Sequence, residues 1–60
     1  MTRKPPMTAN EAREIVAEMF RVTSKRARVG MWKTALSIGN LSEGAREVYR
    51  DALARDGESN

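Results

Sequence analysis

The chain has 60 residues and a formal net charge of +3, is 40% hydrophobic, and contains neither cysteine nor histidine. The lack of cysteine rules out disulfides and thiolate metal sites, and the lack of histidine removes the commonest metal ligand and general base. A chain this short also has little room for a pocket lined by convergent polar groups. We therefore expect one domain that is not an enzyme and holds no metal or cofactor.

The first helix is expected to begin directly after Thr8. Thr8 followed by Glu11 has the pattern of a capping box, in which the two residues satisfy each other's free backbone donors. Apolar residues then recur at spacings of three and four: Ala12, Ile15, Val16, Met19, Phe20 and Val22. The stripe continues to about Ala27, so Gly30 is the expected end of the helix. An earlier end near Ser24 stays open, because β-branched residues lower the helix propensity just before it.

A second, shorter helix is expected from Met31 or Trp32 to Ile38. It should close at Gly39 and Asn40, which both tolerate the left-handed backbone that often follows a helix. Trp32, the lone tryptophan, is expected in the core because its ring offers the largest single burial in the chain. The alternative is that Trp32 is exposed and stacks on a nucleic-acid base.

A third helix is expected from Asn40 or Ser42 to Gly57, and its apolar stripe is the most regular in the chain. The stripe consists of Ala45, Val48, Tyr49, Ala52 and Leu53. Gly44 in the first turn costs about 1 kcal/mol relative to alanine. Either the close approach of another helix or a late, frayed helix start explains this glycine. With the alanines of the stripe, Gly44 also forms a smooth strip suited to packing against a second copy.

These segments predict a small all-α domain, built as three helices or as a helical hairpin with a short middle helix. The domain is expected to span residues 8–57, between a flexible basic arm over 1–7 and a frayed tail over 58–60. About thirteen large apolar side chains supply barely enough burial to offset the ordering of the chain. Dimerisation is therefore expected to complete the core.

The middle of the chain is basic, and the segments on either side of it lean acidic. It holds five basic residues and no acidic one: Arg21, Lys25, Arg26, Arg28 and Lys33. A nucleic-acid backbone rewards such a cluster through counterion release. The same run has a purely structural interpretation, because bases that lie late in the first helix are favoured by the helix dipole without any ligand.

Residues 31–50 resemble the helix-turn-helix pattern, in which an alanine lies in the first helix and a glycine opens the turn. The residues that carry the resemblance are Ala35, Ile38, Gly39, Ala45 and Val48. The resemblance implies that the third helix would enter the major groove of DNA and present Glu43, Arg46 and Arg50.

These features favour a small nucleic-acid-binding or transcription-regulatory protein, dimeric, that contacts phosphates through the basic cluster. The alternative is a protein–protein interaction module, a small inhibitor or adaptor such as phages and other mobile elements encode, whose bases meet an acidic patch on the partner. A third interpretation, a basic helix on an anionic membrane, conflicts with the acidic residues early in the first helix. No apolar segment is long enough for a secretory signal or a membrane span, so we expect a cytoplasmic protein without a membrane partner.

Overall fold

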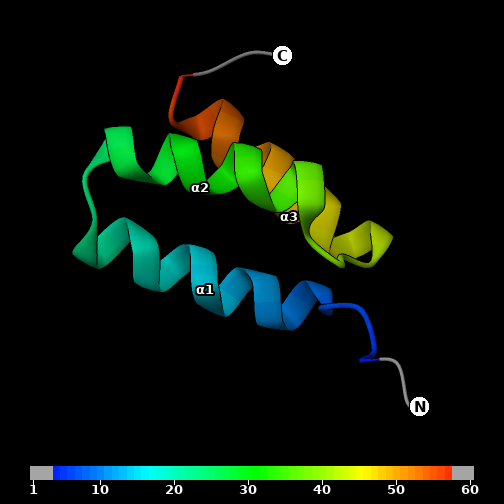
Figure 1. The fold of residues 1–60 in the computed structure, drawn as a ribbon. Coiled ribbons are helices and arrows are strands. Elements are labelled where there is room, and N and C mark those ends of the chain that lie inside the picture. The colour runs from blue at the N-terminus through cyan, green and yellow to red at the C-terminus, as the bar shows by residue number, and fades with distance from the viewer. Residues whose placement is uncertain (1–3, 58–60) are drawn as a thin grey trace.

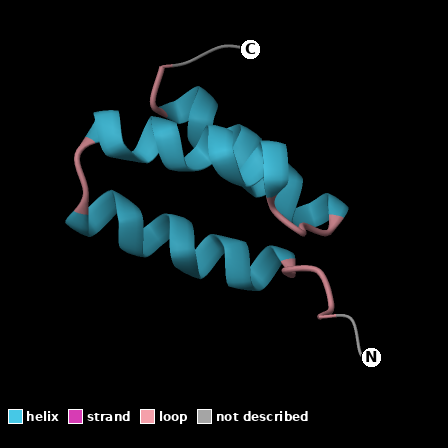
Figure 2. Cartoon of the chain, viewed as in Figure 1, coloured by secondary structure: helices cyan, strands magenta, loops and turns pink. Residues whose placement is uncertain are grey.

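The computed structural model describes residues 4–57, so residues 1–3 and the expected tail over 58–60 lie outside the described residues. It contains three helices, α1 (Ala9–Val22), α2 (Lys25–Ile38) and α3 (Glu43–Arg55) (Figure 1). α2 runs back along α1, and α3 reverses direction again; α1 and α2 each pack mainly on α3 and touch each other much less. The predicted small all-α domain with three helices is confirmed. The middle helix is not short, because α2 has 14 residues, as α1 does (Figure 2).

α1 begins at the predicted capping box. The Thr8 N–H donates to the Glu11 carboxylate at 3.0 Å, and the Glu11 N–H donates to Thr8 Oγ1 at 3.2 Å. Both free donors are thus satisfied within four residues of sequence. The pattern is local, which is why the sequence alone located this helix start.

The prediction that α1 continues to about Ala27 and ends at Gly30 is wrong, and the earlier end near Ser24 is the one observed. Thr23 is extended, and its hydroxyl donates to the Met19 carbonyl at 2.6 Å. Ser24 then caps α2, with its Oγ accepting the Ala27 N–H at 3.3 Å. Hydroxyl side chains that bond nearby backbone groups compete with the helix in this way. As a consequence α2 starts at Lys25 rather than at Met31 or Trp32, and Gly30 lies inside it.

α2 ends at Gly39, as predicted, but not for the predicted reason. Gly39 has φ −72° and ψ 144°, which is extended rather than left-handed backbone. A Cβ atom at this position would collide with the Ala35 carbonyl oxygen, so close approach of the backbone requires the glycine. Gly57 does adopt the left-handed conformation, with φ 85°, just after α3.

Met7 joins the N-terminal segment to the loop between α2 and α3. Its N–H donates to the Asn40 carbonyl at 2.8 Å, and its carbonyl accepts the Ser42 N–H at 3.0 Å. The Tyr49 hydroxyl, whose pKa is raised by burial, donates to the Met7 sulfur at 3.4 Å. Met7 is therefore part of the domain rather than of a free arm.

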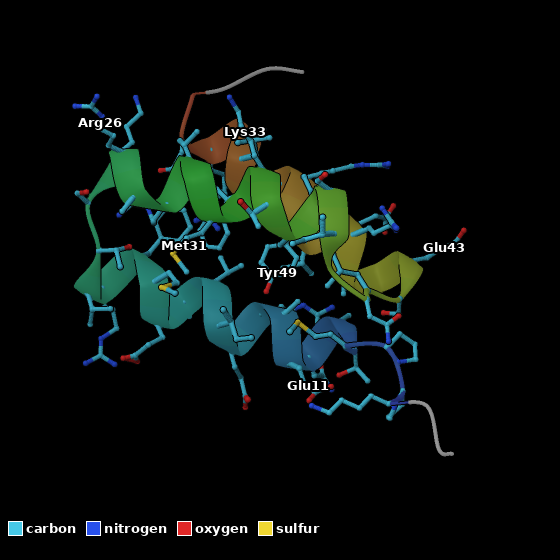
Figure 3. The ribbon with its side chains drawn as sticks, in the orientation of Figure 1. Glu11, Arg26, Met31, Lys33, Glu43 and Tyr49 are labelled. Carbon is cyan, nitrogen blue, oxygen red and sulfur yellow. The ribbon has the colours of Figure 1, made fainter. Side chains whose placement is uncertain are left out.

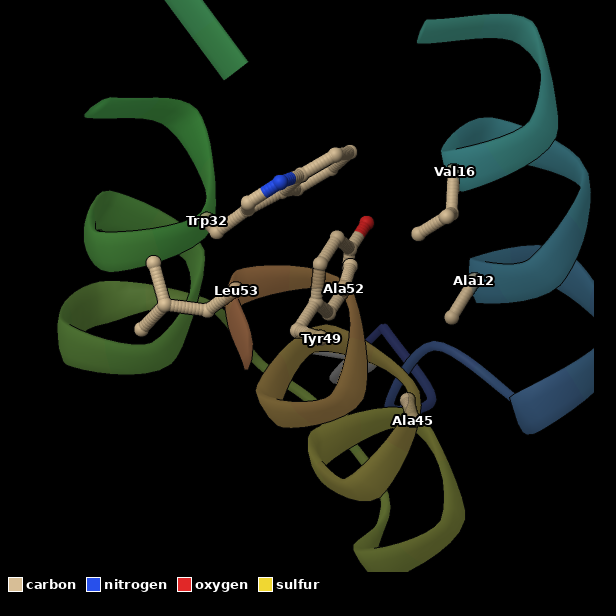
Figure 4. Packing of buried hydrophobic residues seen from close by; sticks show 7 residues of the cluster. All are labelled: Ala12, Val16, Trp32, Ala45, Tyr49, Ala52 and Leu53. Carbon is tan, nitrogen blue, oxygen red and sulfur yellow. The ribbon is translucent and has the colours of Figure 1, made fainter. Parts of the chain in front are cut away.

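The core lies between α3 and the other two helices (Figure 4). Its buried hydrophobic residues are Ala12, Val16, Trp32, Ala45, Tyr49, Ala52 and Leu53. Trp32 is 1% exposed, and its ring lies 6.0 Å from the Phe20 ring and 5.6 Å from the Tyr49 ring, centroid to centroid. The prediction that Trp32 belongs to the core is confirmed, and the base-stacking alternative is wrong.

The small residues of α3 are used inside the chain. A Cβ atom at Gly44 would lie 3.0 Å from the Ala9 Cβ of α1, which confirms that the close approach of another helix explains this glycine. Ala45 and Ala52 are 0% and 1% exposed. The strip that was expected to receive a second copy is therefore already covered in the single chain.

A buried carboxylate connects the ends of all three helices. Asp56 follows α3 and accepts Arg28 Nη2 at 3.0 Å, Arg28 Nε at 3.1 Å and Trp32 Nε1 at 2.8 Å. Arg28 also donates to the Thr23 carbonyl at 2.6 Å, and its guanidinium lies 4.5 Å from the centre of the Phe20 ring. Through Arg28, Asp56 thus ties the C-terminal end of α3 to α2 and to the last turn of α1.

This arrangement predicts the acid sensitivity of the fold. The hydrogen bonds from Arg28 hold the pKa of Asp56 below its ordinary value, with a smaller contribution from Trp32 and against the effect of burial. Because the unfolded pKa is about 3.9, the stabilisation is fully present above about pH 4 and is lost as pH falls through the lower, folded pKa. We predict that Asp56→Asn is less stable at neutral pH and loses less stability on acidification. Urea unfolding across this pH range would contradict us if the variant kept the acid dependence of the wild type.

The two glycines inside helices should respond unequally to alanine. A Cβ atom at Gly30 would meet nothing within 4 Å, whereas one at Gly44 would press on Ala9. Gly30→Ala should therefore raise the free energy of unfolding by about 0.5–1 kcal/mol in dilute solution, and Gly44→Ala should gain clearly less. Urea denaturation of both variants measures the difference. An equal rise in the free energy of unfolding would mean that α1 can shift at Ala9 at little cost and would contradict this prediction.

Candidate nucleic-acid interface

α2 differs from its neighbours in charge. It carries the basic residues Lys25, Arg26, Arg28 and Lys33 and no acidic residue, whereas α1 and α3 each contain three acidic residues. Positive potential is therefore concentrated on this helix, and the sequence cluster becomes mainly a feature of α2.

Arg28 lies apart from the rest of the predicted cluster. Its side chain is 13% exposed and forms an ion pair with Asp56 at 3.0 Å. A phosphate would have to displace a buried carboxylate, and breaking such a pair leaves an uncompensated buried charge. The expectation that Arg28 contacts phosphates is therefore corrected: it is a structural residue. This pairing could not be predicted from the local pattern, because Asp56 lies 28 positions further along the chain.

The other three bases of α2 are exposed. Arg26 and Lys33 are seven positions apart, so they lie on one side of the helix, and both project away from α1 (Figure 3). Lys25 lies in the first turn, and a Cβ atom added at Gly57 would lie 3.5 Å from its ammonium. Its positive charge also contributes to lowering the pKa of Asp56.

Arg21 lies in the last turn of α1, where the helix dipole favours a positive charge. Its side chain is 77% exposed and lies 3.5 Å from the Glu18 carboxylate, an exposed pair that contributes little to stability. The dipole interpretation therefore holds for Arg21. It fails for Lys25 and Arg26, because these residues open α2 and lie at the helix end where the dipole disfavours positive charge.

The third helix does not offer a comparable basic surface. Its outer face is formed by Glu43, Arg46, Glu47 and Arg50. Two acids and two bases leave this face without net charge, and Arg46 donates to the Leu36 carbonyl at 3.4 Å. The face that the helix-turn-helix resemblance would place in DNA is thus less suited to phosphates than α2.

α2 also carries an apolar surface that the sequence analysis missed. We call it the α2 groove, and it is lined by Ala27, Gly30, Met31, Thr34, Ala35, Ile38 and Gly39. Ile38 is 79% exposed and Met31 is 39% exposed, so large apolar side chains border the groove. The regular spacing of Ala27, Met31 and Ile38 indicates this apolar surface only when the three residues belong to one helix. The predicted helix end at Gly30 divided them between two helices.

Comparison of the chain with protein-family models, with curated proteins and with solved structures finds no match. Within residues 4–57, no group of three or more acidic, histidine or cysteine side chains is placed to hold a metal ion. None of the described helices is long and apolar enough to cross a membrane.

Proposed function

We propose that this protein binds the phosphate backbone of a nucleic acid through Arg21, Lys25, Arg26 and Lys33, and acts as a small transcription-regulatory protein in the cytoplasm. The observation that carries the proposal is the position of Lys25 and Arg26. They lie in the first turn of a helix without acidic residues, where the dipole makes positive charge unfavourable. A phosphate beside them would relieve this unfavourable charge, and released counterions would drive the association.

Contacts of this kind position a protein on nucleic acid without reading its sequence. Trp32 and Tyr49 are 1% and 4% exposed, and the guanidinium groups of Arg28 and Arg55 lie over the Phe20 ring, so the described aromatic rings offer no open platform for stacking on a nucleobase. Binding should therefore depend strongly on salt and weakly on sequence.

We predict that the wild-type chain binds random duplex DNA with a slope of log affinity against log salt of roughly 3 to 4 in magnitude, because about four bases contact phosphates. The double variant Arg26→Gln with Lys33→Gln should lower that magnitude by about 2. Fluorescence anisotropy of a labelled duplex at several salt concentrations measures both slopes.

The matched control is Arg13→Gln with Arg50→Gln, which removes the same charge from exposed positions on α1 and α3. This control should keep nearly the wild-type slope. The proposal fails if the wild type does not bind at about 50 mM salt, or if the control lowers the slope as much as the α2 variant does.

A second candidate function is a protein–protein interaction module. The α2 groove favours it, because exposed Met31 and Ile38 lie on the same helix as the exposed bases. A partner with an apolar ridge and an acidic rim would match both features. Absence of nucleic-acid binding would make this the better interpretation.

A further inference from the structure

Four residues of the α2 groove, Ala27, Gly30, Thr34 and Ile38, lie on another side of α2 than the buried Trp32. Ala27, Met31, Thr34 and Ile38 follow one another at spacings of four, three and four, which is the spacing of a seam between two helices. Met31 projects from α2 in the direction of α1 (Figure 3) and is 39% exposed. The seam is formed, but in the single chain no described helix covers it.

The fold of the single chain does not require a glycine at position 30, in the middle of the groove. A glycine inside a helix is less stable than an alanine, and a Cβ atom here would meet nothing within 4 Å. The neighbouring Ala27 and Thr34 are also small. These three small residues together allow the backbone of another helix to approach α2 closely.

We propose that the α2 groove is a homodimer interface in which α2 packs antiparallel against α2 of a second copy. A two-fold axis at the middle of the groove pairs Ala27 with Ile38, Gly30 with Ala35, and Met31 with Thr34 of the other copy. In each pair a larger side chain faces a smaller one. The groove is thus self-complementary in shape, as an interface between identical copies requires.

The charges of α2 select the antiparallel arrangement. In this register Lys25 and Arg26 lie beside the C-terminal end of the other α2, whose last turn contains no basic residue. The positive charges that are unfavourable at their own helix start thereby meet the negative end of the second helix dipole. A parallel arrangement would instead bring the basic ends of both helices together, and like charges in contact oppose association.

The symmetry also bears on nucleic-acid binding, and this one step rests on the proposed function. The two-fold axis lies in the interface and is perpendicular to both α2 helices. Rotation about this axis leaves each flank of α2 on the same face of the dimer. Arg26 and Lys33 of both copies therefore lie on the same face. Dimerisation would double the number of bases facing one stretch of backbone.

The first test compares two exposed, β-branched residues that each end a helix, Ile38 in the groove and Val22 outside it. Sedimentation equilibrium over a hundredfold range of concentration should show a monomer–dimer equilibrium for the wild type. Ile38→Lys should raise the dissociation constant at least ~10-fold, because dimerisation would bury a positive charge beside Lys25 and Arg26 of the second copy. Val22→Lys should leave the constant unchanged, and circular dichroism should show both variants folded.

The second test uses the natural absence of cysteine. Ala27→Cys mixed with Ile38→Cys should form a disulfide-linked heterodimer under mild oxidation. Neither variant alone should cross-link, since Ala27 and its own symmetry mate would lie roughly 16 Å apart along the helix.

Three results would overturn the proposal: a wild type that remains monomeric, Val22→Lys dissociating the dimer as strongly as Ile38→Lys, or Ala27→Cys cross-linking to itself. A monomer that still binds DNA with the salt dependence given above would remove the dimer and leave the proposed function standing. A dimer that fails to bind DNA would remove the proposed function and leave the homodimer interface standing.

Discussion

Within the described part of the chain, the ionised Asp56 is the group whose requirements constrain the helices most. A charge in the interior is costly unless it is paired and fully hydrogen-bonded, and Asp56 meets both conditions through Arg28 and Trp32. Because Arg28 also donates to the Thr23 carbonyl, the end of α1, the first half of α2 and the end of α3 are fixed together. Losing either charged partner would leave the other buried and unpaired.

This structural role of Arg28 determines what the surface of α2 can do. Trp32 and Arg28 lie on the buried side, Arg26 and Lys33 lie on a basic flank, and the α2 groove occupies the remaining side. α1 and α3 have one buried side each and mixed charges elsewhere. The proposed contacts with phosphate and with a second copy therefore both fall on the same helix, on different sides of it.

The features that the sequence predicted correctly are local or depend on size. The capping box at Thr8 spans four residues, and Trp32 is buried because its ring is large. For Gly44 the sequence leaves a close helix contact and a frayed helix start open, and the structure shows the contact. The sequence does not decide the end of α1, because an apolar stripe continues past Ser24 while β-branched residues before it lower the helix propensity. Of the candidate site, the basic cluster could be read from composition, but the pairing of Arg28 depends on a distant residue and the α2 groove depends on the correct start of α2.

The pKa of Asp56 tests most directly whether Arg28 holds this carboxylate in the fold. The carboxyl carbon resonance of Asp56 can be followed by NMR as the pH is lowered, in the wild type and in Arg28→Met, which keeps an apolar side chain against Phe20. The wild-type carboxyl should titrate below the ordinary aspartate value of about 3.9, and its pKa should rise in Arg28→Met. A wild-type Asp56 that titrates at the ordinary value, with no change in the variant, would contradict the structural role of Arg28.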